Sequence, residues 1–350
     1  MRFAHRRYVF VIILFVVCGG AGLPGSLFAG QAQERLAMAY QAYTQQKWDS
    51  AEAALQQALK VYPNYAEAHH LLGLVFAQRQ ETKKAILSLN KAVNLYPSFA
   101  QAHIDLGLLY QQTNQLSLAE QSFRQALTVY PTFLEGLQAL AALHDQRQEA
   151  HKAIETHQKI LELSPQNKES LYGLAFWLAQ EHQSSKAQEH LQALLSLDPK
   201  HVNAWLLAGS LAEQAQHNEQ AIEAYEHALQ IQPELVDPHF HLGMLYQKEG
   251  RYENAAKAFE QVTRLDHDNS EAHVNLGVVY AALSHISQAE QEYHTALRLN
   301  PNLAEAHYNL GLLYEYHKNS PDKALHHYQT YVDLGGKDER ITKLLKRSKG

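Results

Sequence analysis

Residues 100–133 read AQAHIDLGLLYQQTNQLSLAEQSFRQALTVYPTF, and residues 270–303 read SEAHVNLGVVYAALSHISQAEQEYHTALRLNPNL. The two stretches share His at position four, Leu-Gly at seven and eight, Tyr at eleven and Ala at twenty. Proline stands at position thirty-two of such stretches, and it recurs every 34 residues, at Pro63, Pro97, Pro131, Pro165, Pro199, Pro233 and Pro301, with His267 on the missing rung. A fixed period of this length indicates a repeat architecture.

Each 34-residue unit has the pattern of two amphipathic helices. Apolar residues recur at spacings of three and four, as in Leu72, Val75 and Phe76, which is typical of one buried helix face. The small residues at positions eight and twenty allow two helices to cross closely. The proline ends the second helix, because the residue before a proline disfavours the helical conformation. Stacked units must therefore share a core.

This pattern resembles the tetratricopeptide repeat (TPR) family. The resemblance implies an all-α fold, a right-handed superhelical solenoid of antiparallel helix pairs. We expect nine repeats over residues 32–336, with breaks near 65, 99, 133, 167, 201, 235, 269 and 303. The residues that carry the resemblance are five Leu-Gly pairs and an unbroken row of alanines at position twenty. That row is Ala51, Ala85, Ala119, Ala153, Ala187, Ala221, Ala255, Ala289 and Ala324.

Several repeats depart from the pattern. The fourth and fifth have Ala141 and Ala175 in place of glycine, and the sixth has Ala212 in place of the position-eleven aromatic, so a bend or weaker packing is expected there. In the ninth, an extra residue precedes a helix expected to start with Ser320 as N-cap and Pro321 in the first turn. At His267, the preceding helix is expected either to run on or to end through Asp266 and Asp268.

The two ends of the chain differ from the repeats. A basic start, the apolar run 8–17 and a Gly- and Pro-rich segment that should break any helix predict a signal peptide over residues 1–29, cleaved near Ala29. The alternative is an uncleaved anchor. Residues 337–350 read KDERITKLLKRSKG, which predicts a basic capping helix or a tail that docks on anionic surfaces. Membrane association is expected only through these two ends.

Composition excludes several classes of function. The net charge is −6, with no basic face, which argues against nucleic acid as a partner. The only cysteine, Cys18, lies in the expected signal peptide, so we expect no disulfide and no thiolate nucleophile. The chain has no G-x-S-x-G, H-E-x-x-H or glycine-rich phosphate loop. We therefore expect no enzymatic activity and no cofactor.

The 22 histidines are unusual for a chain of this length. Five of them occupy position four of a repeat, where the family places a bulky packing residue: His69, His103, His239, His273 and His307. No two histidines are three or four residues apart, and that is the spacing at which side chains on one helix meet. We therefore expect structural imidazoles and no metal site.

The resemblance also implies a concave groove lined by the first helix of each repeat. Positions five, six and nine of those helices would face a bound peptide, unless several pack on the adjacent repeat instead. The expected partner-binding residues are Tyr172, Phe176, Phe240, His241, Met244, Asn275, Tyr308 and Asn309. The clamp for a C-terminal carboxylate that some family members carry is absent, because it needs Lys at position five and Asn at nine.

The expected function is a non-catalytic scaffold that binds a peptide or protein in this groove. The expected compartment is the periplasm, or the outer side of the inner membrane if the N-terminus stays as an anchor. The alternative function is an accessory subunit of an envelope glycosyltransferase, a cell-wall system or a polysaccharide-export system. Repeats with the style AEAHxNLG resemble those fused to sugar transferases, although no transferase domain follows here.

Overall fold

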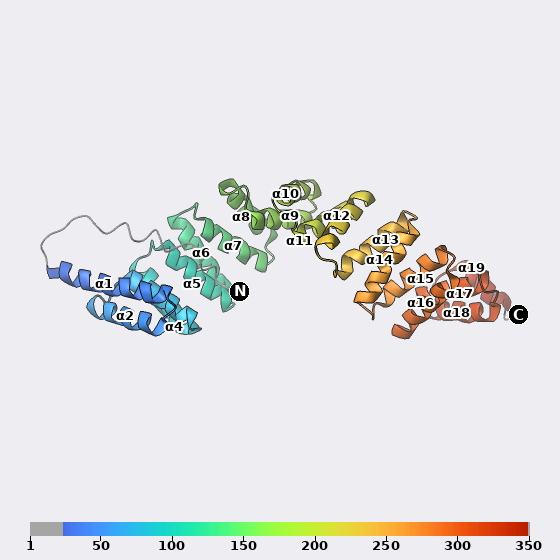
Figure 1. The fold of residues 1–350 in the computed structure, drawn as a ribbon, viewed down its shortest axis with the longest axis horizontal. Coiled ribbons are helices and arrows are strands. Elements are labelled where there is room, and N and C mark those ends of the chain that lie inside the picture. Colours follow the sequence, from blue (N-terminus) through green and yellow to red (C-terminus); the bar gives the residue numbers. More distant parts are fainter. Residues whose placement is uncertain (1–23, 349–350) are drawn as a thin grey trace. The chain divides into compact units, whose positions relative to one another are not determined.

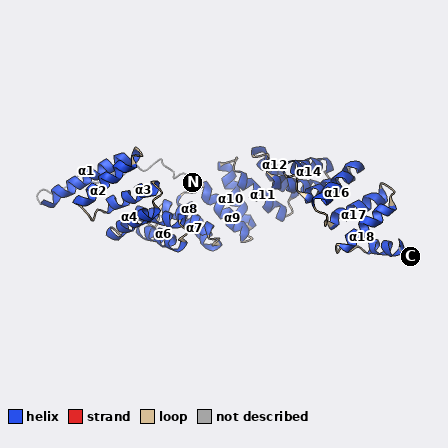
Figure 2. Cartoon of the chain, turned by 90° about the horizontal axis from the view of Figure 1, so that it is seen from below, coloured by secondary structure: helices blue, strands red, loops and turns tan. Residues whose placement is uncertain are grey.

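The computed structural model describes residues 24–348, and all regular structure in that range is helical (Figures 1 and 2). The helices, in chain order, are α1 (Pro24–Thr44), α2 (Trp48–Val61), α3 (Ala66–Gln78), α4 (Thr82–Leu95), α5 (Ala100–Gln112), α6 (Leu116–Val129), α7 (Leu134–Gln146), α8 (Ala150–Leu163), α9 (Lys168–Gln180), α10 (Ser184–Leu197), α11 (Val202–Gln214), α12 (Asn218–Ile231), α13 (Val236–Lys248), α14 (Tyr252–Leu265), α15 (Ser270–Ala282), α16 (Ile286–Leu299), α17 (Ala304–Tyr316), α18 (Pro321–Asp333) and α19 (Glu339–Ser348).

The chain divides into two compact units, the first ending at Pro165 and the second beginning at Gln166. In each unit an odd-numbered helix packs most closely on the even-numbered helix that follows it, and each pair packs on the next pair. The architecture is an all-α solenoid of antiparallel helix pairs, as the period of the sequence predicts. Neither α1–α8 nor α9–α19 has a single central core, because every pair buries its apolar face against its neighbours.

The first described helix begins inside the segment expected to be a signal peptide. Most of that segment, residues 1–23, lies outside the described residues. α1 starts at Pro24 and runs through Ala29 into the first repeat, so Pro24 and Gly25 belong to the first turn of a helix; whether they end a helix of the preceding apolar run lies outside the described residues. Proline is tolerated in the first turn because its missing N–H would have no partner there. Among the described residues, no helix combines the length and apolarity that crossing a membrane requires.

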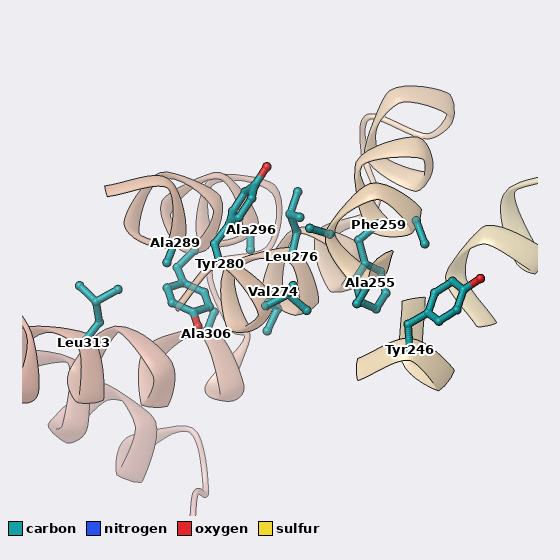
Figure 3. Close-up of a cluster of buried hydrophobic side chains, with 14 of the residues drawn as sticks. Tyr246, Ala255, Phe259, Val274, Leu276, Tyr280, Ala289, Ala296, Ala306 and Leu313 are labelled. Carbon is teal, nitrogen blue, oxygen red and sulfur yellow. The ribbon is translucent and has the colours of Figure 1, made fainter. Parts of the chain in front are cut away.

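In five pairs, α5–α6, α11–α12, α13–α14, α15–α16 and α17–α18, the core includes a contact between a glycine and an aromatic ring. A Cβ atom added to Gly277 would lie 2.5 Å from the ring of Tyr293, and one added to Gly243 would lie 2.6 Å from the ring of Phe259. Both rings are almost fully buried. Figure 3 shows Phe259 within the apolar cluster of the second unit. In these pairs glycine is therefore required at position eight by the close approach of an aromatic side chain from the second helix.

The turn inside each pair has a repeated backbone geometry. The residue one step beyond the C-cap of the first helix has a positive φ, as in Gln80 at 61°. The Glu81 N–H donates to the Phe76 carbonyl, and the Gln80 N–H donates to the Ala77 carbonyl, which together form a Schellman motif. The same left-handed residue recurs every 34 residues, at Gln46, Gln80, Asn114, Gln148, His182, Gln216, Gly250 and Ser284.

The position-four histidines fasten one pair to the turn before it. The Nε2 atom of His69 lies 2.9 Å from the carbonyl oxygen of Pro63, and His103 makes the same contact with Pro97 at 2.9 Å. The equivalent distances at His239 and His307 are 3.0 and 3.2 Å. In the α11–α12 pair, Trp205 Nε1 donates to the Pro199 carbonyl at 2.9 Å. The position-four side chain thus holds the preceding turn through the carbonyl of its proline, and we call this contact the histidine–proline lock.

The missing proline changes this lock but not the helix end. α14 ends at Leu265 with Asp266 as C-cap, so it does not run on, and the Thr263 carbonyl lies 2.7 Å from Nδ1 of His267. His273, the position-four residue that follows, pairs with Glu292 at 2.6 Å instead of with a proline carbonyl. The Nδ1 atom of His273 thus has a partner on the second helix of its pair, as Nδ1 of His307 does.

The last helices cover the end of the second unit. Ser320 is the N-cap of α18 and Pro321 is its first residue, although no side-chain capping hydrogen bond forms. α19 buries Ile341 and Leu345 in the apolar cluster of the unit. Arg340 on the same helix donates to Glu315 at 2.9 Å and to the Tyr328 hydroxyl at 3.2 Å. In this position the apolar stripe of the basic tail covers the core.

Candidate functional site

All eight residues expected to bind a partner lie in the second unit, on the first helices of their pairs. Tyr172 and Phe176 lie one turn apart on α9, and their ring centroids are separated by 6.4 Å. Both are half-buried. The Tyr172 ring also lies 5.2 Å from the ring of His201. Burial raises the pKa of the Tyr172 hydroxyl, so it is a neutral hydrogen-bonding group at physiological pH.

Phe240 on α13 and Tyr308 on α17 belong partly to the core. Phe240 meets the ring of Phe259 edge-on at 5.6 Å, and Tyr308 packs on Tyr331 at 5.2 Å. At the same position of other repeats, Ile104 is fully buried, whereas Gln138 is exposed. Some position-five residues therefore pack between neighbouring pairs, as the alternative allowed, and others keep part of their side chain at the surface.

Met244 and His241 are the most accessible of the expected residues. The Met244 side chain is 42 % exposed, although methionine is usually buried. His241 stacks on Tyr225 at 5.2 Å between ring centroids, and its Nδ1 lies 3.0 Å from a carboxylate oxygen of Glu213. These two side chains give α13 a surface with an apolar part and a polar part.

The two expected asparagines differ in how their amides are used. The Asn275 amide donates to the Glu271 carbonyl of its own helix at 3.1 Å, so part of its capacity is already used within α15. Nδ2 of Asn309 is buried and has no hydrogen-bond partner. An unpaired buried amide costs free energy.

Exposed carboxylates lie one turn before the position-five residues of this unit. Glu169 precedes Tyr172 by three residues, and Asp237 precedes Phe240 by the same spacing. Side chains three residues apart lie on one face of a helix. The exposed acids at this position, here called the acidic edge, are Glu169, Asp237, Glu271 and Glu305. These four acids were not among the partner-binding residues expected from the sequence.

Two cavities lie elsewhere in the second unit, next to second helices. One, of about 470 Å³, lies among α10, α11 and α12 and includes Trp205 and Ala212 in its lining. The other, of about 410 Å³, is lined by polar groups that include His267, His273 and Glu292. The second cavity thus coincides with the missing proline, and the first with the pair that lacks a position-eleven aromatic.

Two histidines of the last repeat are in contact, and their spacing in the sequence did not predict this. Nδ1 of His307 on α17 lies 2.9 Å from Nδ1 of His327 on α18. Burial, and then the neighbouring histidines, lower the pKa of His327 to about 4. Because His307 Nε2 donates to the Pro301 carbonyl, its Nδ1 accepts the hydrogen from His327. In the part of the chain that the structure describes, no group of three or more His, Cys, Asp or Glu side chains is placed to hold a metal ion.

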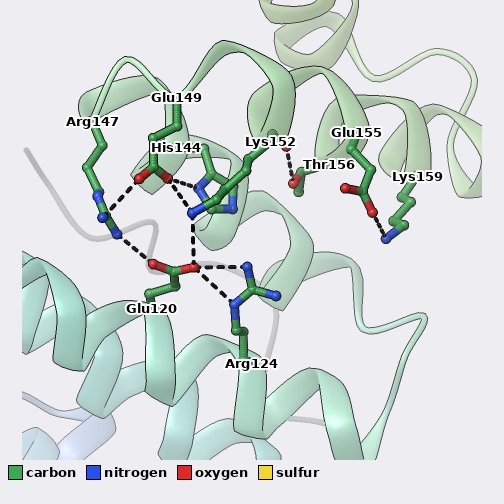
Figure 4. Close-up of polar contacts among 9 residues, drawn as sticks. All are labelled: Glu120, Arg124, His144, Arg147, Glu149, Lys152, Glu155, Thr156 and Lys159. Atoms are coloured by element: carbon green, nitrogen blue, oxygen red, sulfur yellow. Dashed lines mark hydrogen bonds and ion pairs between the residues drawn. The ribbon is translucent and has the colours of Figure 1, made fainter.

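The first unit contains a network of charged side chains where α6, α7 and α8 meet. Glu120 accepts from Arg124 at 2.9 Å and from Arg147 at 2.5 Å, and Arg147 also bonds Glu149 at 2.9 Å (Figure 4). The buried His144, which stands in place of the position-eleven aromatic, pairs with Glu149 at 2.9 Å. Burial nevertheless lowers the pKa of His144. These contacts join α6, α7 and α8 and have the character of a structural network.

Family models match successive parts of the chain. Three tetratricopeptide repeat models match residues 36–102, 100–133 and 246–313. The chain belongs to the tetratricopeptide repeat family. A fourth model, the middle TPR-like domain of cilia and flagella-associated protein 70, matches residues 137–266 of this TPR protein. The search of curated proteins found no match.

Solved structures share the fold of the TPR array at low sequence identity. The C-terminal part of a TPR repeat-containing protein from Cytophaga hutchinsonii matches with a TM-score of 0.59 and 15% identity, over 68% of this chain and 98% of that one. YrrB, described as a TPR protein with an unusual peptide-binding site, gives 0.50 and 22%, over 56% and 100%. PilF of Pseudomonas aeruginosa gives 0.50 and 19%, over 64% and 98%.

Proposed function

We propose that this protein is a non-catalytic scaffold whose second unit binds a segment of a partner protein along its first helices. The observation that carries the proposal is the pairing of half-buried aromatic side chains with carboxylates one turn earlier, as in Tyr172 with Glu169 and Phe240 with Asp237. Aromatic residues provide contact area, and the carboxylates provide orientation. Membership of a family that includes YrrB, described as having a peptide-binding site, supports the same function.

Charge favours a cationic segment as the ligand. Residues 166–336 contain 22 acidic and 10 basic side chains, and the acidic edge is exposed. A surface of one sign steers a partner of the opposite sign and sets its orientation. We therefore expect the bound segment to combine Lys or Arg with apolar residues that contact Tyr172, Phe176 and Met244.

A photo-crosslinking residue at Met244 of the full chain, expressed in its native cell, should capture this partner. Neutralising the acidic edge with Asp237→Asn and Glu305→Gln should lower the yield of the adduct at least threefold, because the attraction for cationic side chains is reduced. Both acids are exposed, so the melting temperature should stay nearly constant. The adduct and its yield are read by immunoblot and mass spectrometry.

The control places the same crosslinker at Leu87, which is 73 % exposed on α4 in the first unit. The adduct formed from Met244 should be absent from this control. The same adduct from both positions, or a yield that ignores the two neutralising substitutions, would contradict binding at this face. Met244 suits this test better than Phe240 or Tyr308, since those two side chains also pack on the core.

Export is part of the proposed function, and it rests on the basic and apolar N-terminal sequence. We expect the native protein to begin at Gly30 and to be found in the periplasmic fraction, because Leu27-Phe28-Ala29 provides a suitable cleavage segment. Edman sequencing of the purified native protein checks this. A mature protein that retains residues 1–29 in the membrane fraction would favour the anchored alternative, and one in the cytosol would contradict export.

A further inference from the structure

The 470 Å³ cavity among α10, α11 and α12 lies where one repeat has lost two large side chains. Its walls include Leu191, Trp205, Ala208 and Ala212. In the next three repeats the residues equivalent to Ala208 and Ala212 are a buried leucine and a buried tyrosine, namely Leu242 with Tyr246, Leu276 with Tyr280, and Leu310 with Tyr314. In this volume, these three repeats hold a leucine and a tyrosine.

The missing tyrosine has a regular hydrogen-bond partner in other repeats. The hydroxyl group of Tyr280 donates to Glu260 at 2.7 Å, and Tyr246 donates to Glu226. The partner can also be an amide, because Nδ2 of Asn90 lies 3.0 Å from the Tyr110 hydroxyl. In each case the partner belongs to the second helix of the preceding repeat.

Gln192 occupies the position of that partner in α10. It stands 34 residues before Glu226 and 68 before Glu260, and it lines the cavity. Ala212, which would carry the ring, is nearly buried at 4 % exposure. The cavity therefore retains an apolar wall and a polar amide, while the phenol ring that joins them elsewhere is absent from α11.

Two other side chains of the cavity lining, Trp205 and Glu223, restrict the shape and charge of a ligand that could bind there. Trp205 is fixed by its bond to the Pro199 carbonyl and by stacking on His227 at 4.4 Å between ring centroids, so one wall is an oriented aromatic surface. Glu223 is the charged residue of the lining. A carboxylate at this place disfavours a phosphate or a second carboxylate, because like charges repel. The cavity thus suits a neutral phenol.

We propose that this cavity binds the side chain of an unphosphorylated tyrosine from a partner protein, with the phenol hydroxyl on Gln192. The ring takes the volume that Tyr246 and Tyr280 take in their own repeats, so the partner completes the repeat in trans. Ala208 and Ala212 have small side chains, so α11 fills less of this space than α13 or α15 does in its own repeat. This site is independent of the first-helix face, and either site can be present without the other.

The test uses the full chain labelled with 5-fluorotryptophan, which reports on Trp48, Trp177 and Trp205. The probes are the capped tripeptides Gly-Tyr-Gly, Gly-Phe-Gly and Gly-phosphoTyr-Gly, with p-cresol as the free side-chain analogue. The Tyr peptide and p-cresol should shift the Trp205 fluorine signal saturably and leave the other two unmoved. The phosphotyrosine peptide should bind at least tenfold more weakly, and the Phe peptide at least threefold more weakly.

Two variants fill the cavity from within the chain. Ala212→Tyr restores the side chain of the other repeats and should weaken binding of the Tyr peptide at least tenfold. Ala208→Leu fills the neighbouring space and gives the same test if Ala212→Tyr does not fold. Ala215→Tyr, at the exposed C-cap of the same helix, is the matched control and should leave binding unchanged. Gln192→Leu should remove the preference for Tyr over Phe.

Four outcomes would overturn the proposal. They are no saturable shift at Trp205 with either phenol, binding that survives both filling variants, equal affinity for the Tyr and phosphoTyr peptides, and binding of p-cresol without the Tyr peptide. The last outcome would assign the cavity to a small phenol in place of a protein. None of these results depends on the acidic edge or on the crosslinked adduct from Met244.

Discussion

Replacing Gly277 with valine should destabilise the second unit by about 3 kcal/mol, the upper end of the cost of overpacking a core. The first added carbon would lie 2.5 Å from Cε1 of Tyr293, well inside van der Waals contact. The Tyr293 ring is only 2 % exposed, so it cannot move into solvent without opening the α15–α16 pair. Urea unfolding followed by far-UV circular dichroism measures the change.

The control for this prediction is Ala282→Val, at the exposed last residue of α15. It introduces the same β-branched side chain into the same helix and should cost only a few tenths of a kcal/mol, about the size of the difference in helix propensity. Equal losses for the two variants would show that valine acts through propensity and that the contact with Tyr293 is not responsible.

A compensating substitution separates the contact from other effects. In the α9–α10 pair, Ala175 stands at the glycine position and Leu191 at the aromatic position, so this fold accepts an alanine where the ring is replaced by leucine. Gly277→Ala should be destabilising alone, and adding Tyr293→Leu should recover part of the loss. A double variant whose loss equals the sum of the two single losses would contradict a direct contact.

The periodic features of the array could be predicted from the sequence because they rest on side-chain size. Gly277 and Tyr293 recur at fixed positions, and each residue type has a steric reason to be there. The expected surface was less accurate. Ile104 and Phe240 occupy the same position, yet Ile104 is fully buried and Phe240 is half-buried. Exposure depends on the packing of the neighbouring pair, which spacing alone does not give.

Other features left little or no signal in the residues. The left-handed turn residue is glycine only at Gly250 and is glutamine at Gln46 and Gln80, so composition could not mark it. His307 and His327 are 20 residues apart and lie on different helices, so the spacing of three or four residues that brings side chains together on one helix does not apply to them. The histidine–proline lock did have a signal, because four of the five position-four histidines stand six residues after a proline.

Replacing Ile341 with aspartate should destabilise the α17–α18 pair by about 4 kcal/mol, because the change removes a buried side chain and places a charge in its position. Ile341 is fully buried on α19 and belongs to the same apolar cluster as Tyr328. A solenoid needs a terminal element that hides its last apolar face. Without α19 that face, which includes Tyr328, would meet water. Hydrogen exchange of α17 and α18 measures the local loss.

The matched control is Lys343→Gln, since Lys343 lies on α19 with its side chain 71 % exposed. It changes the charge of the helix and leaves the apolar stripe intact, so exchange in α17 and α18 should stay slow. A tail whose main role is to dock on anionic surfaces predicts the opposite order: Lys343→Gln would reduce binding to anionic vesicles, and Ile341→Asp would leave the protection of α17 and α18 unchanged. Faster exchange with Ile341→Asp alone would identify α19 as the element that closes the core of the second unit.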